Sequence, residues 1–415
     1  MTRISKKAEK FRRKVSPVRQ IMSFADSEYI QSLGVNPDEL ISMAGGWVNH
    51  ESPEGLRKAY EDLVSDQQSF HKSGKYSATF GEIDFKKAIC KFEKILYDME
   101  ISEKQIAAGS GSTQLAMNLF STILDPEDKI LLLDPYYCNF PTQLITGIPG
   151  VKIISFSVID EENWKYVAEE KIEEFSKYII ENKPKVILLT SPDNPTSKIL
   201  SDKFMKATIN AAKEIDAFVV VDFAYKELIF DEDYPEYFSW APNENFIAIR
   251  SNSKWCRGLG RRLGWIEAPE FVIEAMESLQ NSTSLCPDTL HQMAFTKFLD
   301  ESIEKNSLEK YIKETRELYK KAAKNTSSLI KNLFNFPLIE PDGGMYFFIK
   351  VNTDGTKFVE NALKKAGVLF VPGWGFGRNG INAIRLSFGP LVEENHKIEE
   401  GLKRVAEHLD EIIED

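Results

Sequence analysis

The stretch from Ser251 to Trp265 reads Ser-Asn-Ser-Lys-Trp-Cys-Arg-Gly-Leu-Gly-Arg-Arg-Leu-Gly-Trp, and it follows the apolar run Phe246-Ile-Ala-Ile. That run is typical of a buried strand. Lys254 therefore lies between a strand end and a glycine-rich loop, where burial and nearby cations lower the pKa of an amine and make it a nucleophile. Hydroxyl and basic side chains surround it, and the candidates for holding an anion are Ser251, Ser253 and Arg262.

A guanidinium binds phosphate oxygens through paired donors, so the stretch combines a lysine nucleophile with a candidate phosphate clamp. This combination favours a Schiff base between Lys254 and a phosphorylated carbonyl compound, and pyridoxal phosphate is the commonest cofactor of that kind. The same residues also fit a solvated loop, because Ser-x-Ser-Lys is a short pattern. The rest of the chain decides between these two interpretations.

Composition narrows the class of protein. The chain has 415 residues, a net charge of −11, 42% hydrophobic and 28% charged residues, which is ordinary for a globular protein of two domains. The acidic balance argues against a general nucleic-acid binder, and no apolar stretch is long enough to span a bilayer. Scattered cysteines without metal-ligand spacing predict a reducing, cytoplasmic location; they are Cys90, Cys138, Cys256 and Cys286.

The first twenty residues are basic and lack the apolar centre of a signal peptide. We expect a solvated arm or an amphipathic helix that packs across a neighbouring subunit, with an organelle or nuclear address as the alternative. The basic residues are Arg3, Lys6, Lys7, Lys10, Arg12, Arg13, Lys14 and Arg19.

Strands and helices alternate along most of the chain, as in an α/β sheet. Apolar runs at 129–134, 186–190 and 217–221 predict strands buried on both faces. In an open α/β sheet the carboxyl ends of such strands meet at one crevice, so the residues that follow these runs are expected to lie together. Those residues are Tyr136 and Tyr137, Asn194, and Asp222 and Tyr225.

The segment Gly109-Ser-Gly-Ser-Thr-Gln114 opens a helix directly after a strand. Small residues at such a position form a phosphate cradle, because the first-turn amides point outward and the helix dipole favours an anion. The spacing is neither that of a dinucleotide fingerprint nor that of a P-loop. A plain N-cap by Ser112 or Thr113 explains the same residues.

Two further segments carry candidate ligand residues. Gly45 and Gly46 allow close approach of a ligand, with Trp47 as a lid, although a simple turn before the next helix explains them equally well. Tyr76 lies in an irregular loop, where its hydroxyl either contacts an anion or the ring only packs.

The chain beyond Trp265 predicts long helices and a small second α/β unit, with strands at 345–349, 368–371 and 383–388. Arg385 lies inside an apolar strand, where an unpaired guanidinium is costly. Its partner is therefore either a substrate carboxylate or an internal salt bridge.

Taken together and in this order, these motifs resemble the fold-type-I pyridoxal-phosphate aminotransferases of class I/II, the aspartate and aromatic aminotransferase-like group. The resemblance covers the chain from about Ile41 to the C-terminus. It implies an α/β fold in which helices enclose a mainly parallel seven-stranded sheet, plus a small α/β domain made from both chain ends. The expected divisions are an N-terminal arm with part of the small domain (1–55), a large cofactor-binding domain (56–300) and a C-terminal small domain (301–415).

The resemblance also assigns roles. It implies that Lys254 bonds the cofactor's aldehyde carbon and later moves the proton, and that Asp222 pairs with the pyridine nitrogen. It further implies that Asn194 and Tyr225 bond the ring's phenolic oxygen, that Tyr137 stacks on the ring, and that no metal is needed. The implied phosphate ligands are Ser112, Thr113, Ser251, Ser253 and Arg262, with Tyr76 from a neighbouring subunit, and the implied substrate ligands are Arg385, Gly46, Trp47 and Asn194.

The implied function is amino-group transfer from an L-amino acid to a 2-oxo acid by a ping-pong mechanism, in a homodimer with shared sites. Alternatives are a β-lyase or decarboxylase on the same fold, or a non-catalytic cofactor-binding regulator whose basic arm contacts nucleic acid. The chain departs from the family pattern at Ser197, Phe223, Asn252 and Arg257, and it has Thr113 where some aspartate-specific relatives have a lysine. Arg257, Arg261 and Arg378 are spare cations, and Trp47, Tyr136 and Trp374 are candidate walls for an apolar or aromatic substrate.

Overall fold

The computed structural model describes residues 3–13 and 17–414. Its centre is a seven-stranded sheet in the order β2-β10-β9-β8-β7-β3-β4, and only β10 runs antiparallel to its neighbours. This confirms the mainly parallel seven-stranded sheet. The strands are β2 (Ile106–Gly109), β3 (Lys129–Asp134), β4 (Lys152–Ser157), β7 (Val186–Thr190), β8 (Phe218–Asp222), β9 (Phe246–Ser251) and β10 (Gly264–Glu267).

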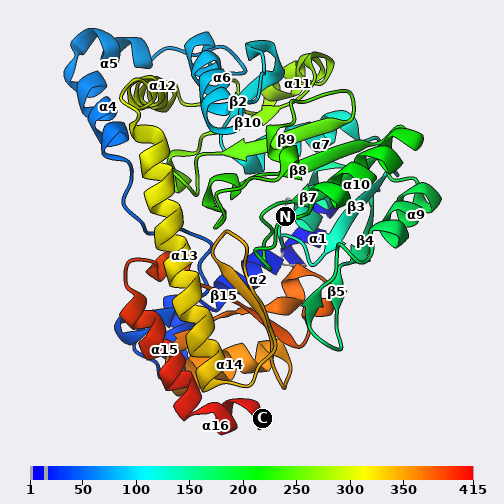
Figure 1. Ribbon diagram of the computed structural model, residues 1–415, viewed down its shortest axis with the longest axis vertical. Helices are drawn as coiled ribbons and strands as arrows, with labels where there is room; N and C mark the ends of the chain where they lie inside the picture. Colours follow the sequence, from blue (N-terminus) through cyan, green and yellow to red (C-terminus); the bar gives the residue numbers. More distant parts are fainter. Residues whose placement is uncertain (1–2, 14–16, 415) are drawn as a thin grey trace.

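The central strands are apolar throughout because helices cover both faces of the sheet. In β8, Val219 and Val221 pack into one core, whereas Val220 packs into the other. One core contains residues of α6 (Ile83–Tyr97), α9 (Ile172–Asn182), α10 (Asp202–Glu214) and α12 (Thr289–Glu304), and the other contains residues of α7 (Ser112–Ile123), α8 (Phe140–Gly147) and α11 (Glu270–Thr283). Helices α4 (Glu54–Ser65) and α5 (Gln67–Ser73) lie at the outer end of this layer (Figure 1).

A buried ion cluster lies on one side of the sheet. Arg250 of β9 bonds Glu93 and Glu227 and lies 3.4 Å from Glu267, and Lys226 lies 3.3 Å from Glu93. Each of these side chains is at most 1% exposed. The attraction between these charges has to offset the cost of removing them from water. Loss of one member therefore leaves the others buried without compensation.

The second unit contains the antiparallel sheet β11-β12-β15-β14 and the parallel pair β1-β13. Its strands are β1 (Ile41–Ser42), β11 (Leu338–Ile339), β12 (Tyr346–Lys350), β13 (Val368–Leu369), β14 (Val371–Pro372) and β15 (Ala383–Ser387). Its helices are α3 (Ser27–Ser32), α14 (Gly355–Ala366), α15 (Asn395–Glu407) and α16 (Leu409–Ile413). The long helix α13 (Ser307–Leu333) runs beside both units, and the N-terminal and C-terminal segments meet in the lower one (Figure 1). The exact division at residues 55 and 300 stays a prediction.

The structure corrects the single strand that we expected at 368–371. Val368 and Leu369 pair with β1, whereas Val371 and Pro372 pair with β15, so the segment crosses between two sheets. A continuous apolar run does not reveal this change, because both halves are equally buried. A separate short pair, β5 (Ile159–Asp160) and β6 (Lys165–Tyr166), was not predicted.

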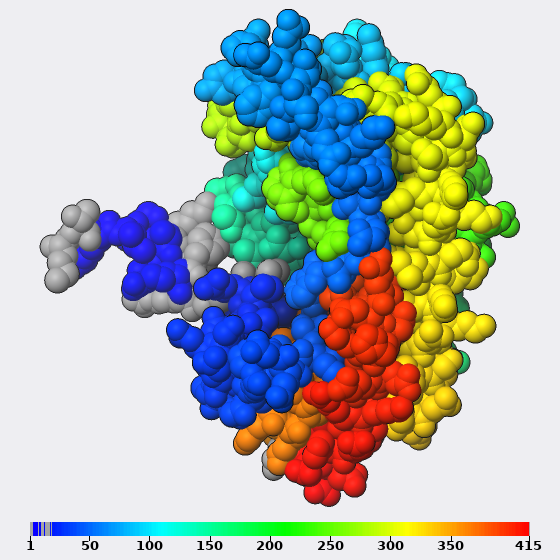
Figure 2. Space-filling view, turned by 90° about the vertical axis from the view of Figure 1, so that its left-hand side faces the viewer, coloured from blue at the N-terminus to red at the C-terminus, as the bar shows by residue number. Residues whose placement is uncertain are grey.

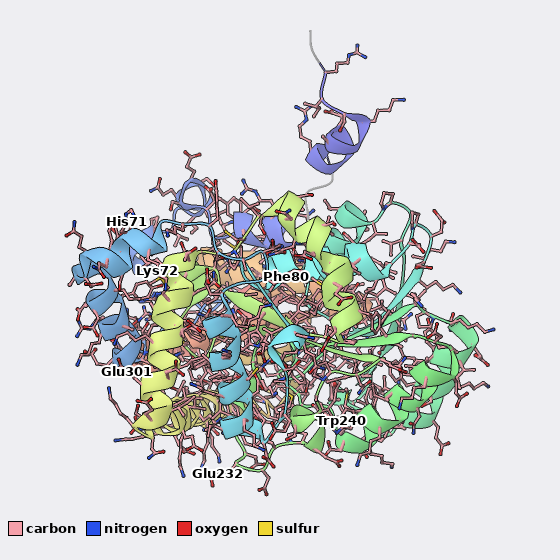
Figure 3. The ribbon with its side chains drawn as sticks, turned by 90° about the horizontal axis from the view of Figure 1, so that it is seen from above. His71, Lys72, Phe80, Glu232, Trp240 and Glu301 are labelled. Carbon is pink, nitrogen blue, oxygen red and sulfur yellow. The ribbon has the colours of Figure 1, made fainter. Side chains whose placement is uncertain are left out.

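The basic N-terminal segment forms α1 (Lys6–Arg13), followed by α2 (Pro17–Ser23). Helix α1 stands away from the rest of the molecule (Figures 2 and 3). Arg3, Lys6 and Arg12 are exposed, and α2 packs against the turn at Gly373–Phe376. Lys14 lies outside the described residues. Among residues 3–13 and 17–414, no helix combines the length and the hydropathy needed to cross a membrane.

Candidate active site

The candidate catalytic side chains follow the carboxyl ends of neighbouring strands. Asp222 is the last residue of β8, Lys254 follows β9, and Asn194 follows β7. In the sheet, Thr190 of β7 lies beside Asp222 of β8, and Asp222 lies beside Ile249 of β9. The three strands therefore end at one edge of the sheet. Arg385 comes from β15 in the other unit and binds Asn194. The site therefore lies where the two units meet.

Lys254 lies among polar groups where the two units meet. Its Nζ donates a hydrogen bond to the carbonyl oxygen of Gly46 and lies 5.5 Å from the ring centre of Tyr225. Its pKa is lowered to about 8, because burial and the positive charges of Arg385 and Arg262 outweigh the carboxylate of Asp222. A lysine with such a pKa has a substantial neutral fraction near neutral pH, as a nucleophile or general base needs.

Asp222 is a partly buried carboxylic acid. Burial raises its pKa to about 6, although the Ala224 N–H at 3.0 Å and the charge of Lys254 both favour the carboxylate. A cationic ring nitrogen placed beside this carboxylate would lower the pKa of Asp222 and would itself be held protonated.

The hydroxyl of Tyr225 contacts a residue that the sequence did not single out. Tyr225 Oη lies 2.7 Å from Tyr346 Oη, and both side chains are buried. Tyr346 begins β12, and its hydroxyl inside an otherwise apolar strand was the signal that would have identified it. Tyr137 is partly buried nearby, and burial raises the pKa of its phenol, with smaller contributions from Cys138, Tyr346 and Asp222.

Arg385 is buried without a carboxylate partner. Its Nη1 donates to Asn194 Oδ1 at 3.0 Å and its Nη2 to the Ala44 carbonyl at 2.8 Å, whereas its Nε has no partner in the described part of the chain. None of the ion pairs found among residues 3–13 and 17–414 includes Arg385. The described residues therefore contain no internal salt bridge to Arg385, and its Nε is left without a partner where an anion could bind.

A corner of backbone amides and basic groups lies at the start of α7. The Cβ of an alanine at Gly111 would lie 2.5 Å from Arg262 Nη2, and a Cβ at Gly264 would lie 2.8 Å from the Ser112 nitrogen. Ser251 pairs with Gly264 in the sheet and bonds Ser253 at 2.7 Å. Thr113 is exposed in the first turn of α7. The N-cap alternative for Ser112 or Thr113 is wrong, because the N-cap is Gly111 and no side chain caps the helix.

The remaining expected ligand residues line the edge of the site. Gly46 accepts the Lys254 hydrogen bond, and Trp47 next to it is 44% exposed. The Trp47 ring folds back over Gly45, where a Cβ would lie 2.3 Å from it. Tyr76 is 82% exposed and bonds no group of the described site.

Arg257 and Asn252 fasten the lysine-bearing loop. Arg257 has a φ of 50° and donates to Asn49 Oδ1 at 2.8 Å and to the His50 carbonyl at 3.3 Å. Asn252 Nδ2 lies 2.9 Å from His291 Nε2. Both terminal nitrogens of Arg257 are therefore bonded to the chain segment that follows Gly46.

The other unusual residues also have structural partners. Ser197 has a φ of 58°, which explains why glycine suits this position, and its Oγ accepts the Tyr346 N–H at 3.0 Å. Phe223 is 1% exposed and packs edge-on against Phe238, with ring centres 5.3 Å apart. Arg261 donates to the Arg257 carbonyl, and Arg378 lies 3.8 Å from the buried Asp134.

The residues present fit pyridoxal phosphate. Glycine at 111 and 264 lets Arg262 and the Ser112 amide lie close together at a helix N-terminus, Asp222 suits a cationic ring nitrogen, and Lys254 is a nucleophilic amine. In the described part of the chain, no cluster of His, Cys, Asp and Glu has the makings of a metal site. The sheet topology together with Lys254, Asp222 and Arg385 defines a lysine-centred α/β transferase of fold type I.

Comparison with known proteins agrees with this class. The chain belongs to the aminotransferase class I and II family, whose model matches residues 40–405. It is 24% identical over 375 residues to an aspartate aminotransferase of Thermotoga maritima, covering 90% of this chain and 92% of that protein. It is 26% identical over 378 residues to aromatic-amino-acid aminotransferase 2 of Thermococcus litoralis, covering 90% and 92% of the two chains.

Solved structures show the same fold. Aspartate aminotransferase of Thermus thermophilus with maleate has a TM-score of 0.84 at 22% identity, covering 98% of this chain and all of that one (100%). Aspartate aminotransferase of Thermotoga maritima has a TM-score of 0.81 at 23% identity, with coverage of 98% and 100%. The family transfers an amino group between an amino acid and a 2-oxo acid and uses pyridoxal phosphate as a general property.

Proposed function

We propose that this chain binds pyridoxal 5′-phosphate at Lys254 and moves an amino group from an L-amino acid to a 2-oxo acid in two half-reactions. One observation carries the proposal. The Arg385 guanidinium is buried without a carboxylate partner and acts electrostatically on Lys254, whose pKa is lowered to about 8. A carboxylate bound at Arg385 would bring its α-carbon toward Lys254, an amine suited to take a proton from it.

The residues around Lys254 divide the task of holding the cofactor. Asp222 would pair with the ring nitrogen, Asn194 and Tyr225 would donate to the ring's phenolic oxygen, and Tyr137 would stack on the ring face. When bound, the cofactor supplies an electron-accepting ring. The proposed phosphate ligands are Ser112, Thr113, Ser251, Ser253 and Arg262.

Lys254 would serve first as the anchoring amine and then as the base that moves a proton at the α-carbon. Its contact with the Gly46 carbonyl holds the amine on one side of the crevice. Arg385, with Asn194 and Gly46, would hold the α-carboxylate and so fix which bond faces the amine. Trp47 would cover the opening.

The site favours some substrate side chains over others. Thr113 supplies no charge for a distal carboxylate, Arg257 is bonded to protein groups, and Trp47 offers an apolar surface. These observations support donors with apolar or aromatic side chains. A donor screen should compare phenylalanine, leucine and aspartate, because relatives are named as aspartate and as aromatic aminotransferases.

We further propose a cytoplasmic homodimer in which Tyr76 completes the phosphate site of the partner. The 82% exposure of Tyr76 supports the shared site, and the four free cysteines support a cytoplasmic location. Mixing a Tyr76→Phe variant with a Lys254→Ala variant tests the shared site. In a mixed dimer, one of the two sites has both Lys254 and Tyr76 intact. We therefore expect the mixture to recover activity, and a mixture without recovery would contradict a shared site.

The central test uses the purified holoenzyme. Borohydride should abolish its visible absorption band and leave the reduced cofactor on Lys254, and label on any other lysine overturns the assignment. Incubation with an amino donor alone should yield the pyridoxamine form and one equivalent of 2-oxo acid. Pyruvate and ammonia, or carbon dioxide, without the pyridoxamine form would instead identify a β-lyase or a decarboxylase.

A further inference from the structure

Tyr346 is in contact with several residues that have a role in the proposed function, but it has no role there itself. Its side chain is fully buried (0% exposed), and its hydroxyl lies 2.7 Å from the hydroxyl of Tyr225. The guanidinium carbon of Arg385 lies 4.3 Å from the centre of its ring. A Cβ added at Gly46 would lie 3.5 Å from its hydroxyl. One side chain thus touches a proposed cofactor ligand, a proposed substrate ligand and the segment that bonds Lys254.

The position of Tyr346 is set from two sides. Strand β12 pairs with β15, with Phe348 opposite Arg385 and Tyr346 opposite Ser387, so Tyr346 and Arg385 are diagonal neighbours on one sheet. The Tyr346 N–H donates to Ser197 Oγ at 3.0 Å, and Ser197 belongs to the loop that carries Asn194. The side chain is therefore fixed relative to both units of the molecule.

The number of protons on the two hydroxyls sets which tyrosine donates the hydrogen bond between them. Each hydroxyl has one proton, and Tyr225 needs its own to donate to the ring oxygen of the cofactor. In the described part of the chain, the hydroxyl of Tyr346 has Tyr225 as its bonding partner. With Tyr225 donating to the proposed cofactor, Tyr346 donates and Tyr225 accepts within the pair, and either direction is open in the structure itself.

We propose that Tyr346 is a positioning residue that couples the substrate clamp Arg385 to the cofactor ligand Tyr225, through its ring face and its hydroxyl respectively. The inference rests on the proposed function. A hydrogen bond donated to Tyr225 polarises its O–H and strengthens its donation to the ring oxygen. That donation stabilises negative charge on the oxygen and thereby lowers the pKa of the nitrogen that Lys254 contributes. The ring face, separately, holds the guanidinium of Arg385 in place.

The two contacts predict different effects of two substitutions. Tyr346→Phe removes the hydroxyl and keeps the ring, so it should raise the midpoint of the pH-dependent visible spectrum of the holoenzyme by about half a unit to one unit. The affinity for 3-phenylpropanoate, a carboxylate without an amino group, should stay within about twofold. Tyr346→Leu removes the ring too, and it should raise the midpoint and weaken 3-phenylpropanoate by roughly tenfold.

Tyr237→Phe is the matched control. Its hydroxyl is equally buried and lies 2.6 Å from Ser191 Oγ, so the substitution removes a similar hydrogen bond that involves neither Tyr225 nor Arg385. It should leave the spectral midpoint and the carboxylate affinity unchanged. A midpoint shift of equal size in Tyr237→Phe overturns the specific role of Tyr346.

A second variant keeps the test decisive if Tyr346→Phe fails to fold. Ser197→Gly suits the φ of 58° and removes only the oxygen that accepts the Tyr346 N–H, so it should shift the midpoint in the same direction by less. An unchanged midpoint in Tyr346→Phe, or in Ser197→Gly if that is the only folded variant, overturns the inference. A wild-type protein with no pH-dependent visible band fails the proposed function instead, which distinguishes the two failures.

Discussion

The guanidinium of Arg257 donates a 2.8 Å hydrogen bond to Oδ1 of Asn49, which joins the lysine-bearing loop to a segment 208 positions away in the sequence. We call residues Gly46–Glu51 the strap. It also bonds the lysine loop through Gly46 and through His50, whose Nε2 lies 3.0 Å from the Trp255 carbonyl. The strap connects the two units on the side where α13 passes (Figure 2). Arg257 therefore helps to set the carbonyl that holds Lys254.

Arg257→Met should loosen the strap. We expect the Michaelis constant for the amino donor to rise about tenfold, corresponding to roughly 1.4 kcal/mol, with a smaller change in kcat. Steady-state kinetics with both substrates measure the split. Arg261→Met is the control, because Arg261 bonds the Arg257 carbonyl and stacks on Tyr60. Equal effects of the two substitutions would contradict a role of the strap.

Arg385→Lys should weaken amino acids and 2-oxo acids alike. A point charge replaces a planar fork that binds a carboxylate through two bonds, so the Michaelis constants should rise by about 10-fold to 100-fold. An amine that lacks a carboxylate provides the control and should react equally with both enzymes. Unchanged Michaelis constants for the acids would remove Arg385 from the substrate site.

Gly111→Ala should weaken phosphate binding. The new Cβ would lie 2.5 Å from Arg262 Nη2 and displace the guanidinium from the start of α7. Gly34→Ala is the control. The φ of Gly34 is 79°, close to the 84° of Gly111, but nothing lies within 4 Å of its added Cβ. Both changes should destabilise the fold because φ is positive, and Gly111→Ala should cost more, about 1 to 3 kcal/mol, because a φ of 84° with a ψ of 161° is adopted almost only by glycine. Only Gly111→Ala should reduce the affinity for cofactor and for inorganic phosphate, by equilibrium titration of the cofactor-free protein.

Asp222→Asn should stabilise the cofactor-free protein at pH 7. Burial raises the pKa of Asp222 to about 6 from 3.8, so the folded state holds a proton over a pH range in which the unfolded state has released it. The cost of the buried carboxylate is therefore fully present above about pH 6 and disappears below about pH 4. Urea unfolding should show a gain of about 1 to 2 kcal/mol at pH 7, because partial exposure screens part of the shift. A gain that persists at pH 3.5 contradicts this origin.

The buried ion cluster should respond unequally to the loss of its members. Burial and the charge of Glu93 raise the pKa of Glu267 to about 8, so it is protonated at pH 7. Glu267→Gln keeps a neutral group that accepts the Trp265 Nε1–H bond, and it should change the free energy of unfolding by less than about 1 kcal/mol. Arg250→Met leaves Glu93 and Glu227 without their shared partner and should cost about 3 to 5 kcal/mol. Thermal unfolding of both variants at pH 7 compares them, and similar losses would contradict the protonated state.

The sequence by itself determined the elements and most of the candidate site. Apolar runs predict the strands at 129–134 and 186–190 with the bounds that the structure has, because strands buried on both faces leave a continuous pattern. Polar residues soon after the apolar runs at 186–190, 217–221 and 246–249 indicate Asn194, Asp222 and Lys254 as candidates, since parallel strands deliver their carboxyl ends to one edge. The family resemblance followed from these local signals and was confirmed.

Tertiary structure alone decided which distant groups meet. The partner of Arg385, the bond between Tyr346 and Tyr225, and the attachment of Arg257 to Asn49 each join segments far apart in the chain. The split of 368–371 between two sheets was likewise invisible, because equal burial leaves one apolar pattern. Hydrophobic periodicity records how much of a side chain is buried, whereas the identity of its neighbours depends on how the two units pack. The lysine at position 254 could therefore be found from its local sequence, and the carbonyl that holds its amine could not.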